Sequence, residues 1–282
     1  MRGASRAKAR EVCAPLEAPR SPSTAASIPR GAVVSAQDLP ALDRALKCAL
    51  PIISIDPEFP DVPGLIGTCC AFRVRGSIVF VTAAHTLKRL NFAETRLEVP
   101  VQFGEGRSEV ARIGQVLTPE PSAQVHEDVC DFSVMLPVQE LRVPSSVEFH
   151  AVDLAEIPEA DRAPKGSDLA FAGYPLGNDG NTVEYGSSPV RVHAHLFHGF
   201  GRYAARPSWG EGLHTMRVDT SAVGGSNGLS GGPVFLLSGQ GVTMAGVMVR
   251  GNAGIVHFID VGFIVEFFRR ESLKIEWSGD AR

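Results

Sequence analysis

The segment Asn227–Pro233 carries one serine within a run of small residues, Asn-Gly-Leu-Ser-Gly-Gly-Pro. A serine hydroxyl is a weak nucleophile until a base removes its proton and donors stabilise the oxyanion that forms. Glycines beside Ser230 allow a tight turn that exposes the hydroxyl and lets backbone N–H groups converge. The segment predicts a nucleophilic serine, with the N–H groups of Gly228 and Ser230 as the oxyanion hole. The alternative is a glycine-rich surface turn in which the serine is incidental.

A histidine and an aspartate stand at the ends of two predicted strands. His85 follows the apolar run Ile78–Val81 after a few small residues, where its ring can face a cleft. Asp131 directly precedes the apolar run Phe132–Leu136, an unusual place for a charge without a partner. Such a carboxylate can accept the Nδ1–H of His85 and fix its tautomer. Taken singly, each residue is as readily structural, and Asp128 is a rival acid; Asp131 is preferred because the strand begins directly after it.

The order His, Asp, Ser resembles that of the trypsin-like, or chymotrypsin-fold, serine proteases. The matching segments are Thr82–His85, Asp131–Val134 and Gly228–Pro233. The resemblance implies an all-β fold of two packed six-stranded antiparallel β-barrels, with His85 and Asp131 from the first and Ser230 from the second. It also implies a serine endopeptidase that acts on a polypeptide substrate through an acyl-enzyme and needs no cofactor. The rival functions are a protease fold kept as a binding or regulatory module, and an esterase.

Further matches point to the bacterial branch that includes the high-temperature-requirement proteases. They are Gly67-Thr68, Gly173-Tyr174-Pro175 and Asp219-Thr220. No additional peptide-binding PDZ domain is expected. Two departures matter: Thr86 stands where secreted relatives carry the partner of a cysteine at the position of Cys70, and Leu229 replaces the aspartate that pairs with a newly cut N-terminus. We therefore expect neither that disulfide nor activation by N-terminal insertion.

The resemblance also suggests where a substrate would bind. Gly224 lies near the floor of the family's main pocket, and with no carboxylate there we expect a small or medium apolar side chain before the cut bond, not Lys or Arg. Met248, Val249 and Arg250 are expected to line the pocket edge and to pair with substrate as an added strand. Arg250 alternatively recruits an acidic side chain.

Three histidines, His193, His195 and His198, form a small cluster. The first two share one face of a strand, a geometry that can hold Zn²⁺. No Cys, Asp or Glu accompanies them locally, so we interpret them as ordinary barrel residues and predict no metal site.

Composition narrows the function classes. The formal net charge is -4 and no block of Lys and Arg is present, which argues against nucleic acid as a partner. No stretch approaches the roughly 20 apolar residues of a membrane span. The basic N-terminus lacks the apolar run of a signal peptide, and the 5 cysteines form no disulfide framework. We expect a cytoplasmic protein with free buried thiols; the oligomeric state stays open.

The chain also divides by composition. It has 29 Gly and 20 Pro, and from residue 65 onward short β-branched runs such as Val190–Phe197 alternate with turns. We predict a disordered segment over 1–34 and a helix and linker over 35–62, the helix spanning Ser35–Leu50. A peptidase domain should follow over 63–275, with barrel one at about 63–145 and barrel two at about 160–265. The pattern from Phe263 to Lys274 predicts a closing C-terminal helix.

Overall fold

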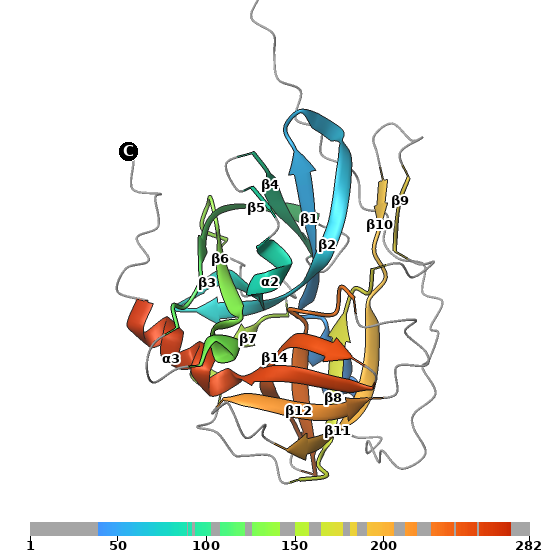
Figure 1. Cartoon of the computed structure of the whole chain (residues 1–282), viewed down its shortest axis with the longest axis vertical. Helices are drawn as coiled ribbons and strands as arrows, with labels where there is room; N and C mark the ends of the chain where they lie inside the picture. Colours follow the sequence, from blue (N-terminus) through green and yellow to red (C-terminus); the bar gives the residue numbers. More distant parts are fainter. Residues whose placement is uncertain are drawn as a thin grey trace, which may run out of the picture.

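The structure is a computed structural model of the whole chain (Figure 1). It describes residues 39–88, 90–91, 94–102, 108–121, 126–141, 150–157, 165–176, 181–184, 191–205, 212–218, 227–239, 241–252 and 254–271. The segment predicted to be disordered, 1–34, lies outside these residues, as do Gly224 and Asp219-Thr220.

The first half of the chain forms a closed antiparallel barrel with strand order β1-β4-β5-β6-β3-β2. Its strands are β1 (Ala49–Asp56), β2 (Phe59–Val74), β3 (Ser77–Ala83), β4 (Arg96–Gln102), β5 (Ser108–Leu117) and β6 (Phe132–Pro137). Pairing of β1 with β2 closes the ring, and the short β7 (Val152–Asp153) adds to β2 in parallel. Two short helical turns flank the catalytic candidates: α2 (Ala84–Leu87) follows β3, and η2 (Glu127–Cys130) precedes β6.

The second half forms another closed antiparallel barrel, with strand order β11-β12-β15-β14-β13-β8. Its strands are β8 (Asp168–Gly173), β11 (Phe197–Ala205), β12 (Leu213–Val218), β13 (Pro233–Ser238), β14 (Gly241–Asn252) and β15 (Ile255–Asp260). Outside it, β9 (Thr182–Glu184) and β10 (Arg191–His193) pair as a separate ribbon, and η3 (Leu154–Glu156) follows β7. The predicted all-β fold of two six-stranded barrels is confirmed.

Helices near both ends of the described chain seal the contact between the barrels. In α1 (Leu39–Leu46), Leu42 and Leu46 are buried in a core cluster that includes residues of both barrels. In α3 (Val261–Glu271), which follows barrel two, Phe267 meets the edge of Phe132 with ring centroids 5.4 Å apart. Phe268 lies 6.2 Å from Phe72 of β2. Thus α3 ties barrel two to the strand that begins after Asp131 (Figure 1). None of the helices in the described part of the chain is long and apolar enough to cross a membrane.

The start of barrel one differs from the expected boundary. The helix ends at Leu46, short of Leu50, and Ala49–Asp56 forms β1 within the segment predicted to be linker. Pro51 cannot continue a helix, and the β-branched residues that follow suit a buried strand.

The strand predicted over Val190–Phe197 also differs, because the structure places β10 before a break and β11 after it. Gly199 and Gly201 interrupt the pattern of β11. A Cβ at Gly199 would lie 2.6 Å from the ring of Phe171, and one at Gly201 would lie 2.7 Å from the carbonyl oxygen of Arg217. These glycines serve close packing, which a period-two pattern does not reveal.

The interface between barrels and α3 gives a stability prediction. Phe72 is 0% exposed and packs against Phe268, so Phe72→Ala should lower the free energy of unfolding by about 3–5 kcal/mol. Phe59 is 59% exposed, so Phe59→Ala should change it by less than about 0.5 kcal/mol. Urea denaturation of both variants measures the two changes. Equal losses would contradict this account of the core.

Candidate active site

His85 is presented by a buried strand that ends in a short helix. All of β3 is buried, and α2 begins directly after it, so His85 stands in the first turn with its side chain 42% exposed. The pairing of Ala83 with Phe132 aligns β3 with β6. In this register the N–H of Ala84 donates to the carbonyl of Asp131 at 3.1 Å. The strand register therefore brings His85 and Asp131 together.

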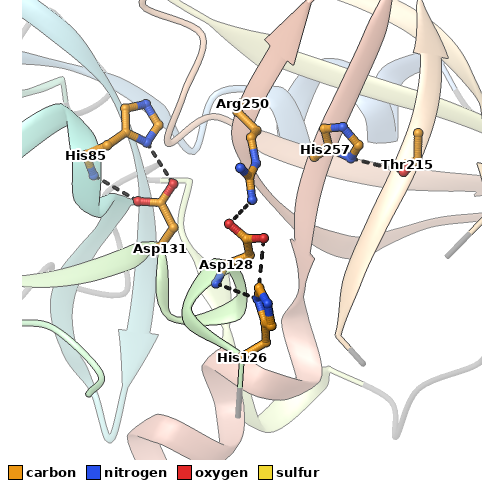
Figure 2. Close-up of polar contacts among 7 residues, drawn as sticks. All are labelled: His85, His126, Asp128, Asp131, Thr215, Arg250 and His257. Atoms are coloured by element: carbon orange, nitrogen blue, oxygen red, sulfur yellow. Dashed lines mark hydrogen bonds and ion pairs between the residues drawn. The ribbon is translucent and has the colours of Figure 1, made fainter. Parts of the chain in front are cut away.

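Asp131 holds His85 through both carboxylate oxygens (Figure 2). The backbone N–H of His85 donates to Oδ1 at 3.0 Å, and Nδ1 lies 2.9 Å from Oδ2. An ionised carboxylate only accepts hydrogen bonds, so Nδ1 carries the proton of the neutral ring and Nε2 carries the lone pair. The Asp131 side chain is 16% exposed, which shields this contact. The imidazole is thus oriented with its basic nitrogen directed away from the carboxylate.

The rival acid, Asp128, faces a different partner. Its carboxylate forms an ion pair with Arg250 of β14, and Oδ2 lies 3.4 Å from Nδ1 of His126 (Figure 2). The N–H of Asp128 also donates to His126 Nδ1 at 3.2 Å. The structure therefore places Asp131, not Asp128, on His85.

Ser230 lies in a tight turn that is fixed to β14. Gly228 and Gly231 have φ of 85° and 93°, values that favour glycine. The N–H of Gly231 donates to the carbonyl of Met248 at 2.7 Å, and the N–H of Met248 donates to that of Gly232 at 2.8 Å. The hydroxyl of Ser230 donates to the carbonyl of Val249 at 3.1 Å, and no hydrogen bond joins Ser230 to His85 within the described residues.

The predicted oxyanion donors lie in the same turn. Among the described residues, no hydrogen-bond acceptor faces the N–H of Gly228 or that of Ser230. The carbonyl of Gly228 is held separately, by the hydroxyl of Thr68 at 2.6 Å. Both N–H groups therefore belong to the serine turn and have no hydrogen-bond acceptor among the described residues.

Thr68 joins the serine turn to both barrels. Its hydroxyl donates to Gly228 and accepts from the N–H of Tyr174 at 2.8 Å, while Thr82 donates to its carbonyl at 2.6 Å. A Cβ on Gly67 would lie 2.8 Å from the Thr86 methyl group and 3.8 Å from the Ser230 carbonyl oxygen. Gly67 thus lies between the residue after His85 and the serine turn. The sequence singled out Gly67-Thr68 and Gly173-Tyr174 only by resemblance; their contacts give the physical reason for them.

A small hollow opens beside Ser230. It is lined by Leu229, Ser230, Met248, Arg250, Gly251 and Val256. Of the predicted substrate-binding residues, Met248 and Val249 are 1% and 0% exposed, whereas the Arg250 side chain is 42% exposed. Val249 therefore contributes its backbone carbonyl to the site, and Arg250 contributes its charged side chain. Gly224 lies outside the described residues.

Two of the three clustered histidines make separate side-chain contacts. His193 faces Glu184 at 3.4 Å, and the ring of His198 meets the edge of Phe200 with centroids 6.4 Å apart. Within the described segments, no group of three or more His, Cys, Asp or Glu side chains is arranged to hold a metal ion. Four cysteines, Cys48, Cys69, Cys70 and Cys130, are free and buried. Burial raises the pKa of the Cys69 and Cys70 thiols well above the usual value, so they are poor nucleophiles.

Comparison with known proteins shows the fold alone. No protein-family model and no curated protein matches the chain. Among the 556 solved chains that match, human heparin binding protein, which has the chymotrypsin fold, aligns with a TM-score of 0.55 and 14% sequence identity. The alignment covers 84% of this chain and 96% of that one. Both barrels are therefore shared with a chymotrypsin-fold protein, while at this identity the likeness does not extend to an activity.

The Thr68 contacts give a second prediction. Thr68 is fully buried, so Thr68→Val would keep the shape but leave the Gly228 carbonyl and the Tyr174 N–H unpaired, at a cost of about 2–4 kcal/mol in unfolding free energy. Thr68→Ser keeps the hydroxyl and should cost about 1 kcal/mol for the lost methyl group. Chemical denaturation measures both. A smaller loss of unfolding free energy for Thr68→Val than for Thr68→Ser would refute the linking role of the hydroxyl.

Proposed function

We propose that the protein is a serine endopeptidase in which Ser230 is the nucleophile, His85 the general base and Asp131 the group that orients His85. The observation that carries the proposal is the two-point contact between Asp131 and His85, close to a glycine turn that presents a serine. This combination is what nucleophilic catalysis by a hydroxyl requires. Polypeptide is the proposed substrate, and the reaction uses no cofactor.

The reaction proceeds by acyl transfer. The hydroxyl of Ser230 attacks the scissile carbonyl while Nε2 of His85 takes its proton, and Asp131 stabilises the resulting imidazolium. The N–H groups of Gly228 and Ser230 hold the oxyanion. His85 then gives the proton to the leaving amine, which departs and leaves an ester on Ser230. Water, deprotonated by His85, hydrolyses that ester and restores the free hydroxyl.

The resting hydroxyl of Ser230 must turn before it reacts. In the structure it donates to the carbonyl of Val249, on the strand along which a substrate would pair. A substrate N–H that takes this carbonyl as its acceptor would release the hydroxyl and leave it free to turn toward His85. In this proposal, binding of the substrate also frees the nucleophile.

Within the trypsin-like proteases, we place the chain nearest the high-temperature-requirement branch. The support is Gly67-Thr68 and Gly173-Tyr174, which contact the serine turn in the structure. A cytoplasmic location follows from the sequence expectations and is part of the same proposal.

Active-site labelling tests the proposal. Purified full-length protein should react with a fluorophosphonate probe, which forms an ester with an activated serine and expels fluoride. Ser230→Ala should abolish the labelling. A wild-type protein that is folded by circular dichroism but never labels would rule out the proposed activity.

The acid of the triad has its own test. Asp131→Asn should lower kcat by about a thousandfold or more, because the amide no longer fixes the tautomer and charge of His85. Glu127→Gln makes the same change of chemistry on the exposed face of η2 and should leave kcat within about twofold. Steady-state cleavage of a fluorogenic peptide measures both. Similar values for the two variants would exclude Asp131 from the site.

A second candidate function is a protease fold used for binding with little turnover. The specific observation in its favour is the bond from Ser230 to Val249, which directs the hydroxyl away from His85. The named structural neighbour binds heparin, but a net charge of -4 does not suit a polyanion. Labelling of Ser230 supports the enzyme over the binding module. Cleavage of a peptide, rather than only of a matched ester, then separates an endopeptidase from an esterase.

A further inference from the structure

An ion pair joins the two barrels beside the candidate nucleophile. Arg250 belongs to β14 of barrel two, one residue after the carbonyl that accepts the Ser230 hydroxyl. Asp128 belongs to η2 of barrel one, three residues before Asp131. Figure 2 shows the guanidinium of Arg250 reaching from its strand to Asp128, beside the pair formed by His85 and Asp131. Each partner of the ion pair therefore lies within three residues of a group that contacts, or is, a catalytic candidate.

Arg250 also lines the hollow beside Ser230. The other residues of the described lining are apolar or small, apart from Ser230 itself, so Arg250 is the charged member of this wall. Leu229, Met248 and Val256 form the apolar part of this small hollow. Residues of an extended strand advance by about 3.3 Å each. If a substrate side chain occupies the hollow, the residues before it in the substrate would therefore lie near the guanidinium.

The ion pair is weakly held. The side chains of Arg250 and Asp128 are 42% and 21% exposed, and pairs this open to water contribute little net stability. Asp128 also contacts His126 through its carboxylate and its N–H. If Arg250 leaves, the N–H of Asp128 keeps its bond to His126, and the carboxylate, which is 21% exposed, can be hydrated. A substrate carboxylate can therefore replace Asp128 without leaving a buried charge unpaired.

A neighbouring histidine, His257, is uncharged at neutral pH, so the positive charge here belongs to Arg250. His257 of β15 lies opposite Arg250 in the strand register, and its Nδ1 is 3.0 Å from the hydroxyl of Thr215. Burial lowers the pKa of His257, nearby Arg250 lowers it further, and Asp128 opposes the shift. The ring is therefore neutral at neutral pH and does not compete with the guanidinium for an anion.

From these contacts we propose that Arg250 is a specificity-determining residue that binds an acidic substrate side chain on the N-terminal side of the cut bond, and that Asp128 is its counter-ion at rest. The proposal rests on the proposed peptidase function. A planar guanidinium binds a carboxylate through parallel hydrogen bonds and repels Lys and Arg at the same place. The substrate class is thus a peptide with a small residue at the cut bond and Asp or Glu a few residues before it.

Matched peptides test the proposal with the full-length protein. Fluorogenic substrates with alanine before the cut bond would carry either Glu or Gln at the second, third or fourth residue upstream. For wild type, kcat/KM should favour the best Glu peptide by about tenfold, mainly through KM. Arg250→Gln should bring the Glu-to-Gln ratio to about one, and Arg250→Glu should turn the preference toward a Lys peptide. Asp128→Asn should raise the ratio several-fold, because the competing carboxylate is gone.

The control is Arg202→Gln. Arg202 is another exposed arginine of barrel two that faces an aspartate, Asp168, at 3.4 Å, and it lies outside the hollow. Its substitution should leave the Glu-to-Gln ratio unchanged.

The outcomes separate this inference from the function on which it rests. A ratio near one in wild type, or a ratio that Arg250→Gln does not change, overturns the role of Arg250 while labelling of Ser230 still supports the peptidase. Equal loss of both peptides in Arg250→Gln and Asp128→Asn overturns it too, since the pair would then be only a structural link. Labelling without cleavage of either peptide also overturns it. Folded protein with neither labelling nor cleavage rejects the peptidase, and this inference with it.

Discussion

One buried hydroxyl joins the two halves of the candidate active site. Thr68 lies on β2 of barrel one, yet its hydroxyl binds the carbonyl of Gly228 and the N–H of Tyr174, which both belong to the second half of the chain. Thr82 donates to the carbonyl of Thr68 from the strand that leads to His85. The serine turn and the histidine strand therefore share one partner. A shift of either barrel would leave a buried polar group unpaired, so these hydrogen bonds add to the shared apolar core in fixing the serine turn against the histidine strand.

The same packing explains why the serine turn must be made of small residues. A Cβ on Gly231 would lie 1.9 Å from the carbonyl oxygen of Thr68, and one on Gly228 would lie 2.5 Å from that of Tyr174. The glycines are thus required by the fold, whatever the protein does. Packing does not require the hydroxyl of Ser230, nor a half-exposed imidazole held by a carboxylate. The proposed catalysis therefore depends on His85, Asp131 and Ser230, and the glycines contribute by shaping the turn that holds Ser230.

Local patterns predicted the residues that stand at strand ends, and missed the contacts that join distant parts of the chain. His85 and Asp131 were predictable because an apolar strand ends or begins beside each of them. The link from Thr68 to Gly228 spans 160 residues, and such a hydrogen bond leaves no periodicity in the sequence. The ion pair of Arg250 with Asp128 escaped prediction for the same reason. The extent of β11 was missed because two glycines, needed for close packing, interrupt its pattern.

β14 carries both contacts that hold the candidate site at rest. Val249 holds the hydroxyl of Ser230, and the next residue, Arg250, holds Asp128 on the opposite wall. A neutral hydrogen bond contributes about 1 kcal/mol and an exposed ion pair about 0–1 kcal/mol, so the two resting contacts together are weak. In the proposed peptidase, a peptide that pairs along this strand would form several backbone hydrogen bonds, and its acidic side chain would replace the lost ion pair. Under that proposal, both resting contacts would be exchanged on one strand when a substrate of the right charge binds.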